Sequence, residues 1–594
     1  MHSLALGILR RTNQLAQYPS DPIILDNWEQ DEIYDRELAT SLACTPTRAA
    51  EIRLAHDASW QTLNAASIAQ AQVTQQEQQG FNAFHSARSN LYSCVLPGEV
   101  VFRCVQALQL GALQPAQLPA IDHLIVDEFQ DLNACDQSFV QLLAGSGAVL
   151  FIAGDDDQSI YSFRHADPSG IVHFPATYPN SSSHILNDCF RCAPAILAGA
   201  DRLITHNVQR VPKQLVALYG AATPPVNGLL HAWSFPDAGA ESRAIAESCR
   251  QLIAAGMAGQ EDQIVILIAN RRVQLDMLTQ ELGNLGLPFD PPRGEGLRDT
   301  AGIRAVYAIL RVLRDTANVA PDYPAHRDLL ATLTGVGVAT CMSVADACIA
   351  NNQNFHDLFY MPVLPHWLNG RQPGAVTRVQ SIAGAVANWT LADPLAQRAG
   401  DIQALLGAHV FTSGNQVAVL RGEWATLAGS LPPAMTLEEC LQFLSADTEA
   451  EQQRTLETVI ARGAPAPVAP AAQPTPKRIR ILTMHGAKGL SGKVVFIPGA
   501  EQGIMPSFRA IQAAGLVIEA RRLFYVSLTR AMACCIVSHA ASHTGASAFQ
   551  LQQQPVVRLA RSQFLNEMAI ASVNRGGGLT TQEATQIFVD LANL

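Results

Sequence analysis

Short apolar runs recur along the chain and predict buried β-strands. They lie at residues 124–126, 149–152, 264–268, 479–482, 494–497 and 535–537. Helical patterns separate most of these runs, and this alternation favours an α/β architecture with mostly parallel sheets. Asp127 follows Val126 directly, and Asp155 comes shortly after Ile152. Carboxylates at the carboxyl ends of parallel strands lie where such sheets bind ligands.

Two long stretches depart from this alternation and predict helical blocks. Residues 25–95 are polar and rich in glutamine, and residues 291–462 are rich in alanine and leucine without strong strand signals. The proline and alanine of residues 463–477 are typical of a semi-rigid linker. Thr580 and Glu583 have the spacing of a capping box ahead of a helix.

These patterns together predict two α/β domains, each interrupted by a mainly helical insertion. The expected boundaries are 1–24 with 96–182 for the first domain, 25–95 for its insertion, 183–290 with 478–560 for the second domain, 291–462 for its insertion, 463–477 for the linker and 561–594 for a C-terminal tail.

The composition indicates a folded protein of several domains. Of 594 residues, 48% are hydrophobic and 15% are charged, which argues against disorder. No apolar run reaches the roughly 18 residues of a membrane span, and the first residues lack the apolar core of a signal peptide. We therefore expect a cytoplasmic protein with no membrane partner. The net charge of −11 means that any nucleic-acid site is a local groove rather than a basic coat.

The strand end at residues 124–131, Leu-Ile-Val-Asp-Glu-Phe-Gln-Asp, carries the first candidate chemistry. An apolar strand followed by Asp-Glu suits nucleoside triphosphate hydrolysis. Asp127 would hold Mg²⁺ through water, and Glu128 would polarise the attacking water. The alternative reading is a strand that simply ends in solvated carboxylates.

The second candidate is the segment at residues 153–166, Ala-Gly-Asp-Asp-Asp-Gln-Ser-Ile-Tyr-Ser-Phe-Arg-His-Ala. Gln158, just past a strand end, can reach a γ-phosphate or its attacking water. Tyr161, Phe163 and Arg164 interleave aromatic rings with a cation, a combination that suits base stacking and phosphate pairing. A calcium loop at residues 155–157 is rejected, because no glutamate closes it at the twelfth position.

Three further segments are weak alone but specific in combination. They are residues 186–191, 481–490 and 519–531. Together with the first two, and in this order, they resemble the UvrD/Rep-like helicases of superfamily 1. Residues 127–131 resemble motif II of that family, 154–166 motif III, 190–191 motif IV (Phe-Arg in place of the usual Tyr-Arg), 483–490 motif V and 519–531 motif VI.

The resemblance implies a fold, cofactors and roles for single residues. The fold would be two RecA-like parallel-sheet motor domains, the first incomplete, that bind ATP and Mg²⁺ between them and step 3′ to 5′ along DNA. The DNA would be single strands and junctions of single and double strands, in repair or recombination. By the resemblance, Asp127 holds Mg²⁺, Glu128 activates water, Gln158 senses the γ-phosphate, Phe190 stacks on adenine, Arg191 and Arg530 are arginine fingers, and His2, Tyr161, Phe163, Arg164, Thr483 and His485 contact single-stranded DNA.

The sequence departs from the family pattern in two places. It contains no Gly-x-x-x-x-Gly-Lys-Ser/Thr loop, because its one Gly-Lys pair, Gly492-Lys493, is followed by valine. Residues 2–10 resemble the family segment that follows that loop. We therefore expect the chain to begin inside the first motor domain and to hydrolyse ATP poorly alone. Ser491 also stands where the family often has a ribose-binding glutamate.

Two explanations for the missing loop stay open. An upstream segment or a partner chain would supply it if the start is misassigned, the gene is split or the chain is truncated. Alternatively, the chain is a non-catalytic DNA-binding or scaffold subunit that uses the helicase fold. An in-frame loop sequence upstream would favour the enzyme, and a stop codon there would favour the scaffold.

Overall fold

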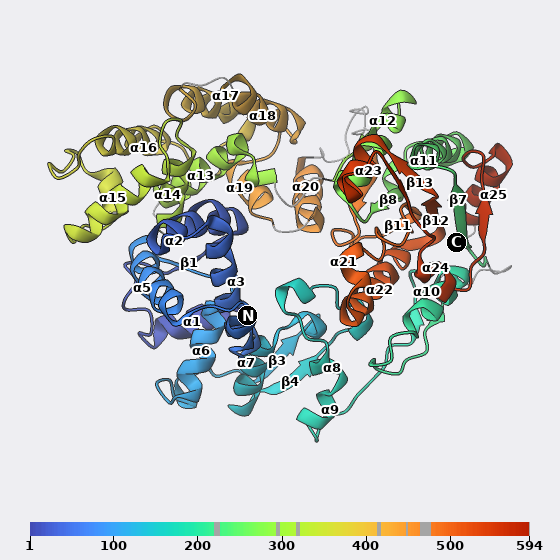
Figure 1. Cartoon of the computed structure of the whole chain (residues 1–594), viewed down its shortest axis with the longest axis horizontal. Coiled ribbons are helices and arrows are strands. Elements are labelled where there is room, and N and C mark those ends of the chain that lie inside the picture. The colour runs from blue at the N-terminus through green and yellow to red at the C-terminus, as the bar shows by residue number, and fades with distance from the viewer. Residues whose placement is uncertain are drawn as a thin grey trace.

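Two α/β bodies and a block of helices make up the molecule. The computed structural model describes residues 1–218, 226–292, 297–316, 321–412, 417–446, 449–463 and 477–592. Figure 1 shows the larger sheet at the right, a two-stranded sheet at the bottom and many helices at the left. Residues 464–476 of the expected linker lie outside the described residues.

A seven-stranded sheet forms the core of the second α/β body. Every neighbouring pair in it is parallel, in the order β15-β7-β12-β11-β8-β10-β9. The strands are β7 (Leu229–Phe235), β8 (Ile264–Ile268), β9 (Phe289–Asp290), β10 (Ile479–Thr483), β11 (Gly492–Ile497), β12 (Ala531–Ala540) and β15 (Ser572–Asn574). Four of the six predicted apolar runs are strands of this sheet, which confirms the parallel α/β fold.

Helices cover both faces of this sheet because its side chains alternate between two cores. Ile266 and Ile536 lie in one core, and Leu267 and Val537 lie in the other. The helices of the first core are α11 (Ala238–Leu252), α12 (Arg271–Asn284) and α25 (Thr581–Ala592), and those of the second are α10 (Pro194–Ile204), α22 (Ala514–Leu528) and α24 (Gln563–Glu567). Burial on both faces explains why the strands are continuous apolar runs.

The C-terminal segment belongs to this body rather than forming a separate tail. β15 pairs with β7, and α25 packs on α11. The three-residue strand Ser-Val-Asn has too little apolar character to be recognised in the sequence. The predicted capping box is confirmed: the Thr580 amide donates to Glu583 Oε2 at 2.8 Å, and the Glu583 amide donates to Thr580 Oγ1 at 3.2 Å.

A two-stranded parallel sheet of β3 (His123–Val126) and β4 (Val149–Ile152) lies in the first α/β body. Helices α1 (His2–Arg11), α6 (Glu99–Gln109) and α7 (Ala134–Gly145) share a core beside it. The alternate side chains face away from this core: Ile125 is 72% exposed, and Val149 and Phe151 are each 62% exposed. These strands therefore present an uncovered apolar face.

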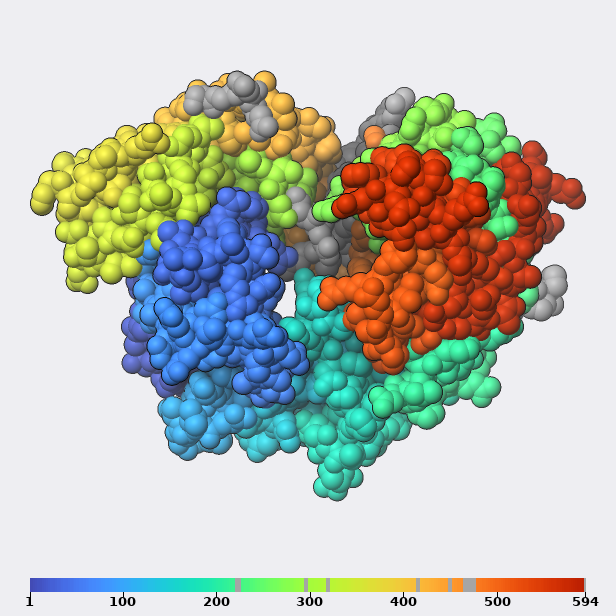
Figure 2. Space-filling model, viewed as in Figure 1, coloured from blue at the N-terminus to red at the C-terminus, as the bar shows by residue number. Residues whose placement is uncertain are grey.

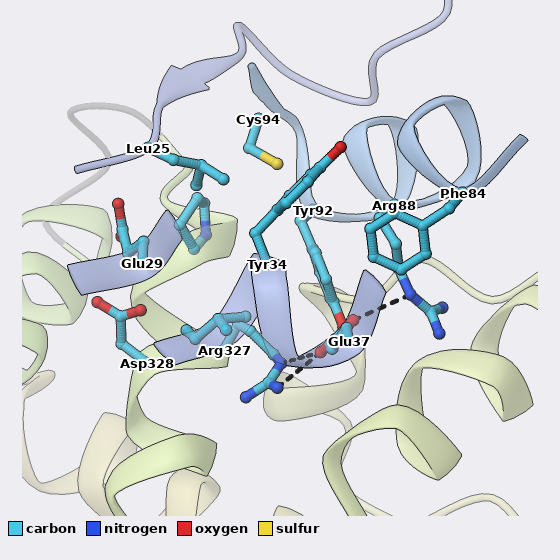
Figure 3. Close-up of a pocket in the computed structure, with 12 residues that line it drawn as sticks. Leu25, Glu29, Tyr34, Glu37, Phe84, Arg88, Tyr92, Cys94, Arg327 and Asp328 are labelled. Carbon is cyan, nitrogen blue, oxygen red and sulfur yellow. Dashed lines mark hydrogen bonds and ion pairs between the residues drawn. The ribbon is translucent and has the colours of Figure 1, made fainter. Parts of the chain in front are cut away.

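The two helical segments pack against each other and share one hydrophobic core. Three arginines of the later segment form ion pairs with carboxylates of the earlier one, each at 2.6 Å: Arg304 with Asp26, Arg311 with Glu29, and Arg327 with Glu37. Figure 3 shows Arg327 and Glu37 in a small cavity between the segments, lined by side chains of both. The elements are η1 (Glu29–Tyr34), α2 (Asp35–Leu42), α3 (Pro46–Thr62), α4 (Ala66–Gln70), α5 (Gln75–Tyr92), α13 (Ala301–Thr316), α14 (Tyr323–Thr332), α15 (Val338–Ala350), η9 (Asp357–Tyr360), α16 (Gln372–Val386), α17 (Leu395–Leu405), α18 (Val417–Ser430), α19 (Leu437–Ser445) and α20 (Glu449–Gly463).

Three shorter strand pairs lie outside these two sheets. They are β1 (Ile23–Ile24) with β2 (Cys94–Val95), β5 (Asp188–Cys189) with β6 (Val216–Ala217), and β13 (Ser542–Thr544) with β14 (Val556–Arg558). All twelve cysteines are free thiols. Within the described ranges, no helix combines the length and the apolar character needed to cross a membrane.

Candidate nucleotide and single-stranded DNA site

The carboxyl end of β3 presents two exposed carboxylates. Asp127 follows the strand directly, and its Oδ1 accepts a hydrogen bond from the Glu128 amide at 2.9 Å. Glu128 has a φ of 51°, in the left-handed region that a residue with a side chain rarely adopts. The chain thus turns sharply here, and such strain is typical of functional sites.

Gln130 ties this turn to the end of β4. Its buried amide nitrogen donates to Glu128 Oε2 at 2.5 Å, and its Oε1 accepts from the Asp155 amide at 3.0 Å. Gly154 leaves room for this link, because a Cβ there would lie 2.4 Å from Gln130 Oε1. Gln130 therefore orients the carboxylate of Glu128, a role that the sequence analysis did not assign.

The three aspartates after β4 pair with basic side chains of the chain itself. Lys213 Nζ lies 2.8 Å from Asp156 Oδ1 and 2.9 Å from Asp157 Oδ2, and Arg210 Nη2 donates to Asp157 at 2.6 Å. Burial alone would lower the pKa of Lys213, but the carboxylates outweigh it and raise that pKa. Gln158 is also held here, donating to Asp155 Oδ2 at 2.8 Å.

Lys488, in the turn after β10, reaches across to the first α/β body. Its Nζ donates to Asp131 Oδ2 at 2.5 Å and to the Gln158 carbonyl at 3.3 Å, and lies 3.4 Å from Glu128 Oε2. Burial raises the pKa of Asp131, although the neighbouring ammonium acts in the opposite direction. Lys488 thus brings motifs II, III and V together. The only sequence signal for it is a lysine between two glycines in motif V.

Four of the predicted DNA contacts form one aromatic group. The Phe163 ring meets Tyr161 edge-on at 5.8 Å and His485 edge-on at 5.9 Å, measured between ring centroids. The Arg164 guanidinium lies 5.8 Å from the Tyr161 centroid and 5.9 Å from that of Phe163. Phe163 is 59% exposed, so the group offers an open ring and a cation, as base stacking beside a phosphate requires.

The two predicted arginine fingers differ in exposure. Arg191 and the neighbouring Phe190 are exposed just after β5. Arg530 is buried, and its guanidinium donates to the carbonyls of Val526 at 3.0 Å and Leu490 at 3.2 Å. Burial, followed by the charge of Arg191, lowers the pKa of Arg530 to about 10.

Comparisons with known proteins find matches to two parts of the chain. The UvrD/REP helicase N-terminal domain matches residues 1–179, and the UvrD-like helicase C-terminal domain matches residues 437–542. Both matches are to UvrD-like helicases, so the chain resembles that family in its N-terminal and C-terminal parts. The first matched range contains motifs II and III, and the second contains motifs V and VI.

Curated relatives are similar at modest identity. The chain is 26% identical over 431 residues to "ATP-dependent DNA helicase PcrA" of Staphylococcus aureus, covering 71% of this chain and 55% of the relative. It is 26% identical over 420 residues to "DNA helicase II" of Haemophilus influenzae, with coverages of 71% and 55%, and 27% identical over 419 residues to PcrA of Bacillus subtilis, with coverages of 69% and 53%. The chain thus spans about half the length of the curated relatives it matches.

Two of the remaining predicted residues of this UvrD-like chain, Thr483 and Ser491, flank the turn after β10, and the third, His2, lies elsewhere. Thr483 Oγ1 accepts from the Gly486 amide at 3.0 Å and so shapes the turn that carries Lys488. Ser491 directly precedes β11, and its carbonyl accepts from Arg480 at 2.6 Å. His2 lies on α1, where Nε2 is 2.9 Å from the Pro97 carbonyl oxygen.

Proposed function

We propose that this chain is the motor part of an ATP-dependent 3′ to 5′ DNA helicase that acts on single strands and junctions in repair or recombination, in the cytoplasm. The observation that carries the proposal is the Lys488 bridge from the turn after β10 to Asp131 and Glu128. A contact across the two α/β bodies suits a motor in which nucleotide chemistry opens and closes a cleft.

The carboxylates at the β3 end would handle the nucleotide. Asp127 has an exposed carboxylate at a strand end, which fits Mg²⁺, an ion that proteins bind through one or two carboxylates and the phosphates of the substrate. Bound Mg²⁺ would neutralise phosphate charge. Glu128, oriented by Gln130, would accept a proton from water, and Gln158 would sense the γ-phosphate. Arg191 and Arg530 would stabilise charge from the second body, while Phe190 and Ser491 would contact the base and the ribose.

The aromatic group of Tyr161, Phe163, Arg164 and His485 would hold single-stranded DNA, with Thr483 and His2 as further contacts. Figure 2 shows the molecule hollowed above the teal segment, between the blue and orange parts. Stacking contributes about 1–3 kcal/mol per base. Phe163→Ala should therefore weaken binding of a fluorescent oligothymidine roughly 5- to 150-fold by anisotropy. Phe549→Ala is the matched control, because Phe549 is 60% exposed on α23 (Gly545–Gln552).

We further propose that a segment carrying a Gly-x-x-x-x-Gly-Lys-Ser/Thr loop covers the apolar face of Ile125, Val149 and Phe151. It would belong to an extended form of the chain or to a partner. The exposure of Ile125, Val149 and Phe151 supports this covering segment, because exposed apolar patches mark interaction sites. Residues 1–594 alone should then show little ATP turnover, because they would lack the cradle for the phosphates.

The decisive experiment is ATP hydrolysis by residues 1–594 and by a form extended to include such a loop, with and without single-stranded DNA. If the chain is a motor, we expect DNA-stimulated ATP turnover in the extended form only. Glu128→Gln should abolish that turnover. Turnover by residues 1–594 that Glu128→Gln abolishes would refute the missing-cradle proposal and keep the motor.

A non-catalytic DNA-binding or scaffold subunit is the second candidate. Arg530 favours it, because the guanidinium is buried and donates to carbonyls of its own chain. If the chain is a scaffold subunit, we expect it to bind DNA in a way that depends on Phe163. We then expect no ATP turnover, even in the extended form.

A further inference from the structure

Three potential metal ligands converge in the helical block, away from the motifs. Asp315 lies in the last turn of α13, His326 lies in α14, and His356 directly precedes η9. One ligand atom from each lies within 4.8 Å of the others. His356 Nε2 is 2.7 Å and His326 Nε2 is 3.8 Å from Asp315 Oδ2. The three side chains thus point at one place from three elements.

The outer nitrogen of each histidine has an oxygen partner. His326 Nδ1 lies 2.9 Å from the Asp322 carbonyl oxygen, which as an acceptor fixes the proton on Nδ1 and leaves Nε2 with a lone pair. His356 Nδ1 lies 3.4 Å from Asp357 Oδ1. Histidines that bind metals almost always donate their other N–H to a carbonyl or carboxylate, which orients the ring.

We propose that Asp315, His326 and His356 form a binding site for a divalent transition metal ion, with Zn²⁺ as the best fit. Two imidazole nitrogens and a carboxylate oxygen are ligands that Zn²⁺ takes at about 2.0–2.2 Å, so neighbouring ligand atoms stand about 3.3 Å apart around a tetrahedral ion. The distances of 2.7 and 3.8 Å bracket that value. Side-chain shifts of about half an ångström would therefore seat the ion.

One side of the cluster lies near the protein surface. His326 and Asp315 are buried, whereas His356 is partly exposed and Tyr360 is 42% exposed. Tyr360 Oη lies 3.0 Å from His326 Nε2. A water molecule would be the fourth ligand of the ion, and the Tyr360 hydroxyl would lie beside it. The ion would join the end of α13, helix α14 and the start of η9, so it would act as a structural pin in the helical block.

The same side chains can also hydrogen-bond without metal, and direct metal binding separates the two cases. Untagged residues 1–594, stripped with a chelator and dialysed, are titrated with Co²⁺ and followed by visible absorption. We expect one equivalent of Co²⁺ to bind and to give the d–d bands of a tetrahedral site of nitrogen and oxygen ligands. Cys189 and Cys192 are free thiols three positions apart, and Co²⁺ binding there would instead give a near-ultraviolet band of thiolate ligation. Zn²⁺ should displace the Co²⁺.

The variants use the more exposed positions so that the fold survives. His356→Gln should abolish the one-equivalent signal, and Asp357→Asn should weaken Co²⁺ binding about 10- to 100-fold. Tyr360→Phe and the exposed His366→Gln should bind like the parent. Circular dichroism melts in chelator check that each variant is folded. Absence of saturable one-to-one binding by the parent, or equal binding by folded His356→Gln, would overturn the proposal.

Discussion

Replacing Lys488 by methionine should loosen the contact between the two α/β bodies. Methionine keeps the length of the side chain but removes the ammonium that donates to Asp131 and to the Gln158 carbonyl. Asp131 would then keep a largely buried carboxylate without its cation. Lys493→Met is the matched control, because Lys493 lies on β11 and donates to Gln260 within the second body at 3.0 Å.

The size of the effect follows from the burial of the pair. A hydrogen bond to a charged group contributes about 1.5–3 kcal/mol. The side chains of Lys488 and Asp131 are only 10% and 19% exposed, so water screens them weakly. Glu128 is 55% exposed and contributes little. A loss of about 2 kcal/mol changes the opening equilibrium of the contact roughly 30-fold.

Hydrogen exchange with mass spectrometry measures this opening locally, without assuming two-state unfolding of a large chain. In Lys488→Met, amides of residues 127–131 and 486–490 should both exchange about 10- to 100-fold faster. Asp131→Asn should speed amide exchange as Lys488→Met does. The double variant of Lys488→Met and Asp131→Asn should exchange only slightly faster than either single variant. Faster exchange confined to residues 486–490, or an equal effect in Lys493→Met, would refute the bridge.

Three further predictions test other parts of the structure. Gly154→Ala should destabilise the protein by about 1–3 kcal/mol in thermal melts, because its Cβ would meet Gln130 Oε1 at 2.4 Å, whereas Gly145→Ala, with open space around it, should not. Burial, together with the charge of Glu501, raises the pKa of Glu241 to about 8. The folded protein therefore keeps this proton at pH values where the unfolded chain has lost it. The contribution of Glu241 to stability is fully present below about pH 4.5 and is lost as the pH rises through 8, at about 1.4 kcal/mol per pH unit. Glu241→Gln should flatten melting temperature against pH between 5 and 9, and an unchanged slope would contradict the assignment. In the extended form, Arg530→Ala should abolish DNA-stimulated ATP turnover with DNA binding nearly intact, and equal loss of both would remove Arg530 from catalysis.

The apolar patterns predicted most of the sheet because buried parallel strands need apolar side chains on both faces. β8 coincides with the predicted run at residues 264–268, and β4 with the run at 149–152. β9 and β15 were not predicted, because two or three residues are too few to show a pattern. Their place in the sheet comes from pairing with strands far away in the sequence.

The candidate site divides in the same way. Asp127 and Glu128 could be proposed from the sequence because they directly follow a strand end, and Tyr161 and Phe163 because they stand beside Arg164 in a short aromatic and basic run. Lys488 could not, because its partner Asp131 lies 357 positions earlier. The metal-ligand cluster escaped for a related reason, since Asp315 and His356 stand 41 positions apart and meet only when helices pack.

The sequence by itself determined the α/β class, the helical blocks and the motif residues, because these depend on local periodicity and on short spacings. Only the tertiary structure decided which carboxylate meets which cation, which apolar face stays uncovered and which histidines share an aspartate. Such pairings depend on chain segments that approach each other through packing, and no local pattern records that approach.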